Sequence, residues 1–377
     1  MKTMVLQLRR RFWRTLLAST FAASIVCVPI STTAQVRGTT DVADVSSRLS
    51  ELTRRLNAKP LDATVVEESR AFGVELLDTS RFEDAVRLFA AFRLAVPTDP
   101  AGFYGGALAL FNLRRINEAE VLARTAVEKA QAFSPPKSSN RDAAMKAPKT
   151  FASVADSLVL LGVVLAVKGD DAGALAAVTG AVALAPGNYD AQFALGRALY
   201  GTGDPAGAAR AFRAAVSLKP TDARTRFFLA SSLERAGDDA AALVAYRELL
   251  AVAPTAAEGH LGVGVLLVKH TGDDLNEGIR ELEKALAINE RLYEGQVALG
   301  RAFIKTGRVA DSIAPLKRAV ELAPDNPEPH YQLAIAYRRL GQKEAADAES
   351  AIVKKIHAAR RASSVARSDE TAPTRRP

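Results

Sequence analysis

Apolar and small residues recur along most of this chain at the three- and four-residue spacing of a helix face. Leu195 and Leu199 lie one turn apart in one segment, and Ala208, Phe212 and Ala215 follow in the next. Such spacing predicts amphipathic helices whose apolar faces pack together. The segments come in pairs, and many pairs end at a proline, which cannot continue a helix. The pattern therefore predicts an all-α chain of helix pairs.

The pairs recur at a fixed period. Pro186, Pro220 and Pro254 are each 34 residues apart and close the similar segments AVALAPGN, AVSLKPTD and LLAVAPTA, and Pro324 closes AVELAPDN. A fixed period of this length indicates a solenoid of stacked units. Solenoids build extended surfaces that usually bind a partner, so the period predicts a class of function as well as a fold.

The skeleton Leu195-Gly196-x-x-Leu199, then Ala208-x-x-x-Phe212, then Pro220 resembles the tetratricopeptide repeat. The resemblance implies a right-handed superhelical α-solenoid of stacked antiparallel helix pairs. Weaker copies, including one at Gly73, Ala85 and Phe89, extend the array to about eight units between residues 66 and 360. Glycines are expected to end the first helices in a left-handed conformation. These glycines are Gly203 and its counterparts Gly169, Gly237, Gly272, Gly307 and Gly341.

The repeat register and the composition of the ends predict the domain organisation. Its parts, in order, are a signal peptide (1–34), a linker with a short amphipathic helix (35–65), two repeat units (66–133), an inserted Pro/Lys-rich loop (134–150), repeat units three to eight including a capping helix (151–360) and a disordered basic tail (361–377).

The N-terminus has the pattern of an export signal. A basic head with Arg9, Arg10 and Arg11 precedes an apolar run from Leu16 to Ile30, and small residues lead to a cut after Ala34. The arginines also resemble a twin-arginine export motif. We expect the protein to be exported to the periplasm or cell envelope. The alternative is an uncleaved inner-membrane anchor.

Residues 41–57 place Val42, Val45, Leu49, Leu52 and Leu56 on one helix face. Two heptads are too few for a stable isolated coiled coil. The seam therefore predicts either a helix packed on the first repeat or a short self-association surface.

The net charge of +8 lies at the two ends of the chain. Residues 1–34 and 354–377 contribute +5 each, which leaves −2 on the stretch between them. The solenoid body is thus close to neutral, and we expect no nucleic-acid partner. Membrane contact is expected only through the signal segment or the basic tail, which is otherwise a solvated end. The loop 134–150, with a balance of +3, is either a plain surface loop or a partner-binding loop.

Sequence motifs for catalysis are missing. The four histidines form no HExxH motif, and the only cysteine, Cys27, lies in the apolar run of the signal. The stretch GTGDPAG follows a predicted helix, whereas a phosphate-binding loop follows a strand. We therefore expect no enzyme activity, no cofactor and no metal.

The resemblance to tetratricopeptide repeats also implies which residues face the concave groove. The clamp by which chaperone-binding members hold a C-terminal carboxylate is not present, because Val159 and Val163 stand at its opening position. Arginine and aromatic residues are the usual anchors of recognition. The alternative is that the aromatic residues only pack between first helices. The groove candidates are Phe193, Arg197, Tyr200, Phe227, Ser231, Arg235, Arg301, Tyr331 and Arg338.

These observations favour a non-enzymatic scaffold in the cell envelope that binds a protein or peptide segment in its concave groove. The alternative is a structural accessory subunit of an envelope assembly, such as a polysaccharide or pilus export machine. A peptide binder would use a few aromatic and arginine anchors, whereas a bridging subunit would use broad faces and edges.

Overall fold

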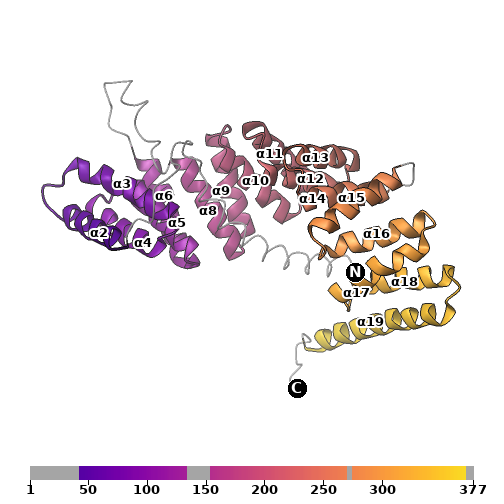
Figure 1. The fold of residues 1–377 in the computed structure, drawn as a ribbon. Coiled ribbons are helices and arrows are strands. Elements are labelled where there is room, and N and C mark those ends of the chain that lie inside the picture. Colours follow the sequence, from indigo (N-terminus) through magenta and orange to yellow (C-terminus); the bar gives the residue numbers. More distant parts are fainter. Residues whose placement is uncertain (1–41, 134–152, 270–273, 371–377) are drawn as a thin grey trace, which may run out of the picture. The chain divides into compact units, whose positions relative to one another are not determined.

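The computed structural model describes residues 42–133, 153–269 and 274–370, and these ranges contain seventeen α-helices and no strand (Figure 1). The segments expected to be the signal peptide and the inserted loop lie outside the described residues. The chain divides into two compact units, residues 1–219 and 220–377. In the described part, no helix has the length and apolar character that a membrane span requires.

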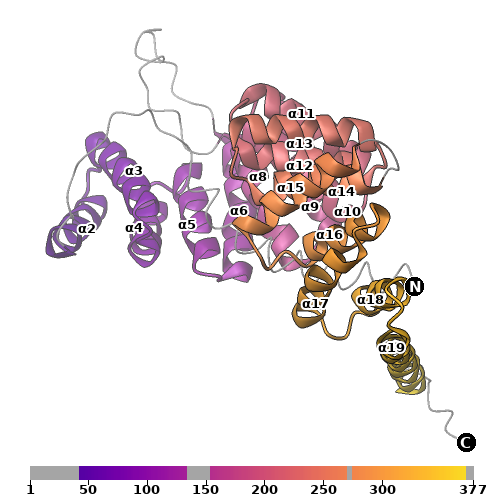
Figure 2. The same ribbon diagram turned by 45° about the vertical axis from the view of Figure 1, so that its right-hand side comes forward.

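The N-terminal unit opens with α2 (Val42–Leu56) and continues as four helix pairs, in which each second helix packs on its own first helix and on the next one (Figure 1, Figure 2). The pairs are α3 (Ala63–Asp78) with α4 (Phe82–Ala95), α5 (Pro100–Asn112) with α6 (Ile116–Ala132), α8 (Val154–Lys168) with α9 (Asp171–Leu184), and α10 (Tyr189–Thr202) with α11 (Pro205–Leu218).

The C-terminal unit holds four more pairs, and the prediction of an all-α solenoid of helix pairs is confirmed. The pairs are α12 (Ala223–Arg235) with α13 (Asp239–Val252), α14 (Ala257–Lys269) with α15 (Leu275–Ile288), α16 (Tyr293–Lys305) with α17 (Ile313–Leu322), and α18 (Pro327–Arg339) with α19 (Lys343–Glu370). A 3-10 turn, η1 (Val309–Ser312), leads into α17. Pro315 lies near the start of α17 and has no N–H to donate back to Asp311, so the regular helix begins late.

The basic end of the chain differs from the expectation. We expected residues 361–377 to be disordered, but α19 continues to Glu370, so residues 361–370 are helical. No glycine or proline interrupts the chain between Lys343 and Glu370, and alanine, the best helix former, is frequent there.

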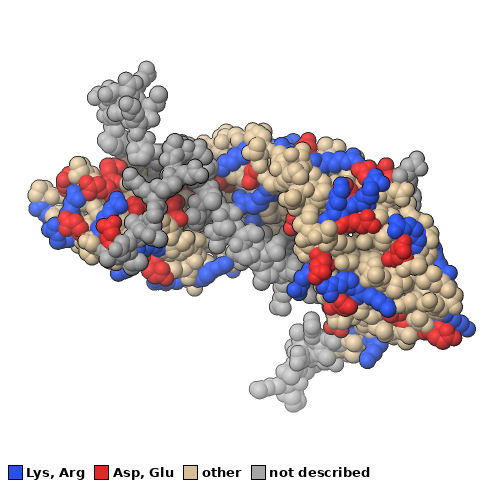
Figure 3. Space-filling model, viewed as in Figure 1, with Lys and Arg blue, Asp and Glu red and all other residues tan. Residues whose placement is uncertain are grey.

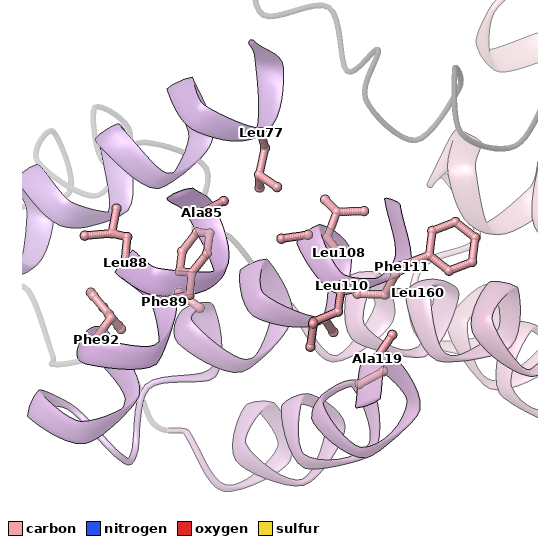
Figure 4. Close-up of a cluster of buried hydrophobic side chains, with 14 of the residues drawn as sticks. Leu77, Ala85, Leu88, Phe89, Phe92, Leu108, Leu110, Phe111, Ala119 and Leu160 are labelled. Carbon is pink, nitrogen blue, oxygen red and sulfur yellow. The ribbon is translucent and has the colours of Figure 1, made fainter. Parts of the chain in front are cut away.

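Small residues and large side chains alternate in the core of each pair. A Cβ added at Gly73 would lie 2.4 Å from the Phe89 ring, and one at Gly105 would lie 2.3 Å from it, so this ring fills the space between two successive first helices. Phe212 lies against Gly196 in the same manner. Figure 4 shows part of this core in the first pairs. The glycines therefore allow close helix approach, and the rings fill what remains.

The turns after the first helices confirm the prediction for glycine. Gly169, Gly203, Gly237, Gly307 and Gly341 all have φ between 75° and 95°, and Gly272 lies outside the described residues. Ser80 and Arg114 occupy the same position in the first two pairs with φ of 59° and 62°. Side chains with a Cβ rarely adopt this conformation, so these two turns carry backbone strain.

Helix α2 covers the first pair. It contacts α3 and α4, and its seam residues Val45, Leu49, Leu52 and Leu56 are buried. Arg48 adds a cation–π contact with Phe72 and an ion pair with Glu75 on α3. The seam is therefore used in packing within the chain and is not available for self-association.

Candidate functional site

The first helices line the inner face of each unit. Successive first helices contact one another, as α5, α8 and α10 do in the N-terminal unit and α12, α14, α16 and α18 do in the C-terminal unit. Successive second helices make no contacts of similar extent within the described residues. A stack whose first helices approach more closely than its second helices curves toward the first helices, so a ligand groove is expected on their exposed face.

A polar side chain near the start of four of these helices fixes each one to the loop before it. Gln192 donates to the carbonyl of Pro186 (3.0 Å), and Arg226 donates to that of Pro220 (2.7 Å). The ring of His260 bonds the carbonyl of Pro254 (2.9 Å), and Gln296 donates to that of Glu290 (3.0 Å). We call this contact the loop anchor.

The loop anchors lie where tetratricopeptide repeats often carry a tryptophan, four residues before the small residue of the first helix. The repeats of this chain contain no tryptophan, since its only tryptophan is Trp13, and the loop-anchor residue takes the tryptophan position. The sequence pattern that could have revealed the loop anchors is the polar residue at this position in four successive repeats. Two anchors also reach a carboxylate on the second helix, since Arg226 pairs with Glu248 (2.9 Å) and His260 with Glu281 (2.6 Å).

In the N-terminal unit, the aromatic groove candidates are packing residues. Phe193 is 8 % exposed, stacks on Tyr189 at 5.9 Å between ring centroids and meets the edge of Phe212 at 5.6 Å. Tyr200 is equally buried, and Arg197 is half-buried. These rings therefore stabilise the stack, as the alternative in the sequence analysis proposed, and offer little surface to a ligand.

Tyr104 on α5 belongs to the same face of this unit. Burial raises the pKa of its phenol, and the charges of Asp156 and Asp190 raise it further. The three groups come from α5, α8 and α10, so the acids of two neighbouring helices converge on a phenol that stays neutral over the physiological range.

The candidates in the C-terminal unit separate into buried and exposed groups. Ser231 is buried, and Phe227 is half-buried with its ring against the edge of Phe228 at 5.6 Å. Arg235, Arg301 and Arg338 are exposed, and Tyr331 keeps 55 % of its surface exposed. The exposed candidates on α16 and α18 are therefore Arg301, Tyr331 and Arg338.

Neighbouring cations are already engaged, which distinguishes them from the exposed candidates. Lys305 donates to the carbonyl of Val268 (2.5 Å), and Arg339 donates to that of Ile304 (3.0 Å). Each thus satisfies a carbonyl at the C-terminal end of the preceding first helix, where a positive charge is favourable. Arg301 and Arg338 form no ion pair or hydrogen bond with any residue that the structure describes. These two guanidinium groups keep their donors for solvent or a partner.

One acid on the inner face of this unit is shifted toward its protonated form. Burial raises the pKa of Glu234, although Tyr246 donates a hydrogen bond to it at 2.8 Å; the charges of Glu294 and Asp239 raise the pKa further. Within the described ranges, no group of three or more His, Cys, Asp or Glu residues could hold a metal ion. On the face that Figure 3 shows, acidic and basic side chains are interspersed.

Two family models match segments of this chain, one described as a tetratricopeptide repeat over residues 193–257 and one described as a TPR repeat over residues 300–341. These segments are tetratricopeptide repeats. One match falls mainly in the pairs from α10 to α13 and the other spans α16 to α18, so there is a recognised repeat in each unit. No curated protein matches the sequence.

Solved structures of TPR proteins resemble the fold. The C-terminal part of a TPR repeat-containing protein from Cytophaga hutchinsonii is 16 % identical, covers 70 % of this chain and 99 % of its own, and has a TM-score of 0.51. PilW, described as a widely conserved type IV pilus biogenesis factor, is 19 % identical, with 54 % and 93 % of the chains covered and a TM-score of 0.47. YrrB, described as a TPR protein with an unusual peptide-binding site, is also 19 % identical, with 55 % and 95 % covered and a TM-score of 0.45.

Proposed function

We propose that this protein is a non-enzymatic TPR scaffold that binds a peptide segment of a partner protein on the inner face of its C-terminal unit. Arg301, Tyr331 and Arg338 are the anchors. The observation that carries the proposal is their exposure on successive first helices, without a described partner for either arginine, in a molecule whose other candidate aromatics are used in packing.

The chemistry of these side chains indicates which segment would bind. Two guanidinium groups accept carboxylates through paired hydrogen bonds, and an exposed tyrosine supplies a rigid apolar ring with a polar end. An extended segment carrying acidic and apolar side chains matches this set. The partner is expected in the cell envelope, because the N-terminal segment has the pattern of an export signal.

Site-specific photocrosslinking in the native host would test the proposal. A photoreactive phenylalanine derivative at Tyr331 should give a discrete crosslinked product, and the same derivative at Val244 should not. Val244 is a matched control, because it lies on second helix α13 of the same unit and is 57 % exposed, close to the 55 % of Tyr331. Arg301→Ala and Arg338→Ala should weaken the Tyr331 product without changing the thermal melt. A product at Val244 but not at Tyr331 would contradict groove binding and favour the alternative, a structural subunit that bridges through outer faces.

The proposed location has its own test. Intact mass of the protein recovered from the envelope fraction should show loss of residues 1–34. Full-length protein in the cytoplasm would contradict export, and full-length protein in the inner membrane would favour the uncleaved anchor.

A further inference from the structure

A second surface, distinct from the inner face, lies between two second helices of the N-terminal unit. A groove of about 280 Å³ opens between α4 and α6, with Val86, Leu110 and Leu122 among its lining residues. Arg93 also lines the groove, as do Arg115 and Glu118, which form an ion pair with each other. The volume suits one or two side chains of a peptide and is small for a drug-sized ligand or cofactor.

The charge of Arg93 is not compensated within the described residues. The Arg93 side chain lies across α5, donates one hydrogen bond to the carbonyl of Gly102 (3.2 Å) and stands 5.8 Å from the centre of the Phe103 ring. Lys129 approaches the same ring at 5.9 Å, so a second cation is near. Burial lowers the pKa of Arg93, which means that its charge is partly removed from water.

No acid on α4 or α6 forms a described ion pair or hydrogen bond with Arg93, and three of these acids are engaged elsewhere. Asp84 pairs with both Arg81 and Arg87. Glu118 receives two hydrogen bonds from Arg115, and Glu120 pairs with Arg124 and Lys168. A half-buried guanidinium with most of its donors unused is unfavourable unless a carboxylate reaches it. Within the described residues, Arg93 thus has donors available for a carboxylate of a partner.

Two exposed apolar side chains lie in or next to the segments that line the groove. Val121 on α6 lines the groove and is 63 % exposed, and Leu94, the next residue after the lining residue Arg93 on α4, is 81 % exposed. These are the most exposed large apolar side chains in the part of the chain that the structure describes. Exposed apolar groups gathered beside a groove mark interaction sites, whereas single ones need no explanation.

We propose that this α4–α6 groove binds a partner peptide in which an acidic group lies next to aliphatic side chains, the carboxylate pairing with Arg93 and the aliphatic groups covering Leu94 and Val121. The loop 134–150 of this chain is a poor occupant, because its balance of +3 would add positive charge beside Arg93 and Lys129. An acidic polysaccharide would satisfy Arg93 but would gain nothing from Leu94 and Val121.

Selection from a random phage-displayed peptide library on the full chain tests this proposal. The library should be depleted on a Val121→Ser variant before each round, so that only peptides using this groove are enriched. The enriched peptides are expected to share an Asp or Glu beside Leu, Ile or Val. Enrichment of peptides without an acidic residue, or failure to enrich any, would overturn the proposal.

The best peptide is then measured by fluorescence anisotropy against matched variants. Val121→Ser should weaken binding about fivefold or more, since an apolar contact is lost. Arg93→Gln, or Glu→Gln in the peptide, should weaken it about tenfold or more, since a charged hydrogen bond is lost. Leu184→Ser on α9 is the control, because Leu184 is 61 % exposed in the same unit but lies outside the groove lining.

Two further outcomes would also overturn the proposal. One is equal loss of binding in Leu184→Ser and Val121→Ser, which would show a non-specific apolar effect. The other is concentration-dependent dimerisation of the chain alone that Val121→Ser abolishes, which would make a second copy the occupant. Because neither α16 nor α18 contributes to this groove, loss of the inner-face crosslink at Tyr331 leaves this test unaffected.

Discussion

Exchanging serine and glycine at the left-handed turns should move stability in opposite directions. Ser80 and Gly203 end the first helices of two pairs with φ of 59° and 91°. Both turns make the same closing hydrogen bond, from Arg81 to the carbonyl of Leu76 (2.8 Å) and from Asp204 to that of Leu199 (2.9 Å). A Cβ at Gly203 would meet no atom within 4 Å, and the Ser80 hydroxyl has no described hydrogen-bond partner. Neither position therefore has a described side-chain hydrogen bond or clash that would mask the effect of its backbone conformation.

The expected magnitude follows from two opposing effects. A residue with a Cβ in the left-handed region costs about 1–2 kcal/mol, and replacing it by glycine relieves this cost. Glycine also gives the unfolded chain more conformational freedom, which lowers the free energy of unfolding by about 0.4–1 kcal/mol. Ser80→Gly should therefore raise the free energy of unfolding by up to about 1 kcal/mol, and Gly203→Ser should lower it by about the same amount.

Urea unfolding followed by helical circular dichroism measures both changes. The transition midpoints should shift in opposite directions with unchanged slopes, and melting temperatures should move by about 2–4 °C for units of this size. A Ser80→Gly variant that is less stable than the parent, or a Gly203→Ser variant that is as stable, would refute the account of strain at these turns.

Three other changes test the packing and the charges. Phe212→Ala removes a fully buried ring and should cost about 3–5 kcal/mol of stability in a thermal or urea melt; a cost below about 1 kcal/mol would contradict its packing role. Ser69 is fully buried and its hydroxyl has no hydrogen-bond partner among the described residues, so Ser69→Ala should be neutral or stabilising by about 1 kcal/mol, and clear destabilisation would contradict this. Burial raises the pKa of Glu281, but hydrogen bonds from Lys284 and His260 outweigh this effect, so its pKa in the folded state lies below the ordinary 4.5. A lowered pKa stabilises the fold above the unfolded value and loses this contribution as pH falls through the folded value. Glu281→Gln should therefore be less stable than the parent at neutral pH, with the difference shrinking well below pH 4.5; a difference that does not change with pH would contradict the shift.

The sequence predicted the features that recur in every unit, because recurrence separates them from chance. The helix pairs, the small residue facing a large one as at Gly196 and Phe212, and the glycine turns all follow from spacing. The turns at Ser80 and Arg114 were missed, since a strain of about 1–2 kcal/mol is small enough for packing to impose it on another residue.

The sequence could not divide the groove candidates by exposure. Phe193, Arg301 and Tyr331 occupy related positions on first helices, yet Phe193 is buried by Tyr189 and Phe212, whereas Tyr331 is half exposed. Which neighbour covers a side chain depends on the size of residues far away in the sequence. The α4–α6 groove was missed for the same reason: it arises where two second helices separate, and no motif marks it.

The loop anchors have a consequence for how such a chain can change over evolutionary time. The acceptor in each is a main-chain oxygen, which every residue supplies, so only the donor side chain constrains the sequence. Glu290 stands where the other loops have a proline, and its carbonyl still accepts a hydrogen bond from the Gln296 side chain at 3.0 Å. A tryptophan packed against specific neighbours would need matching changes on both sides. Here the loop residues can change while the hydrogen bond to the next helix is kept, and glutamine, arginine and histidine all serve as its donor.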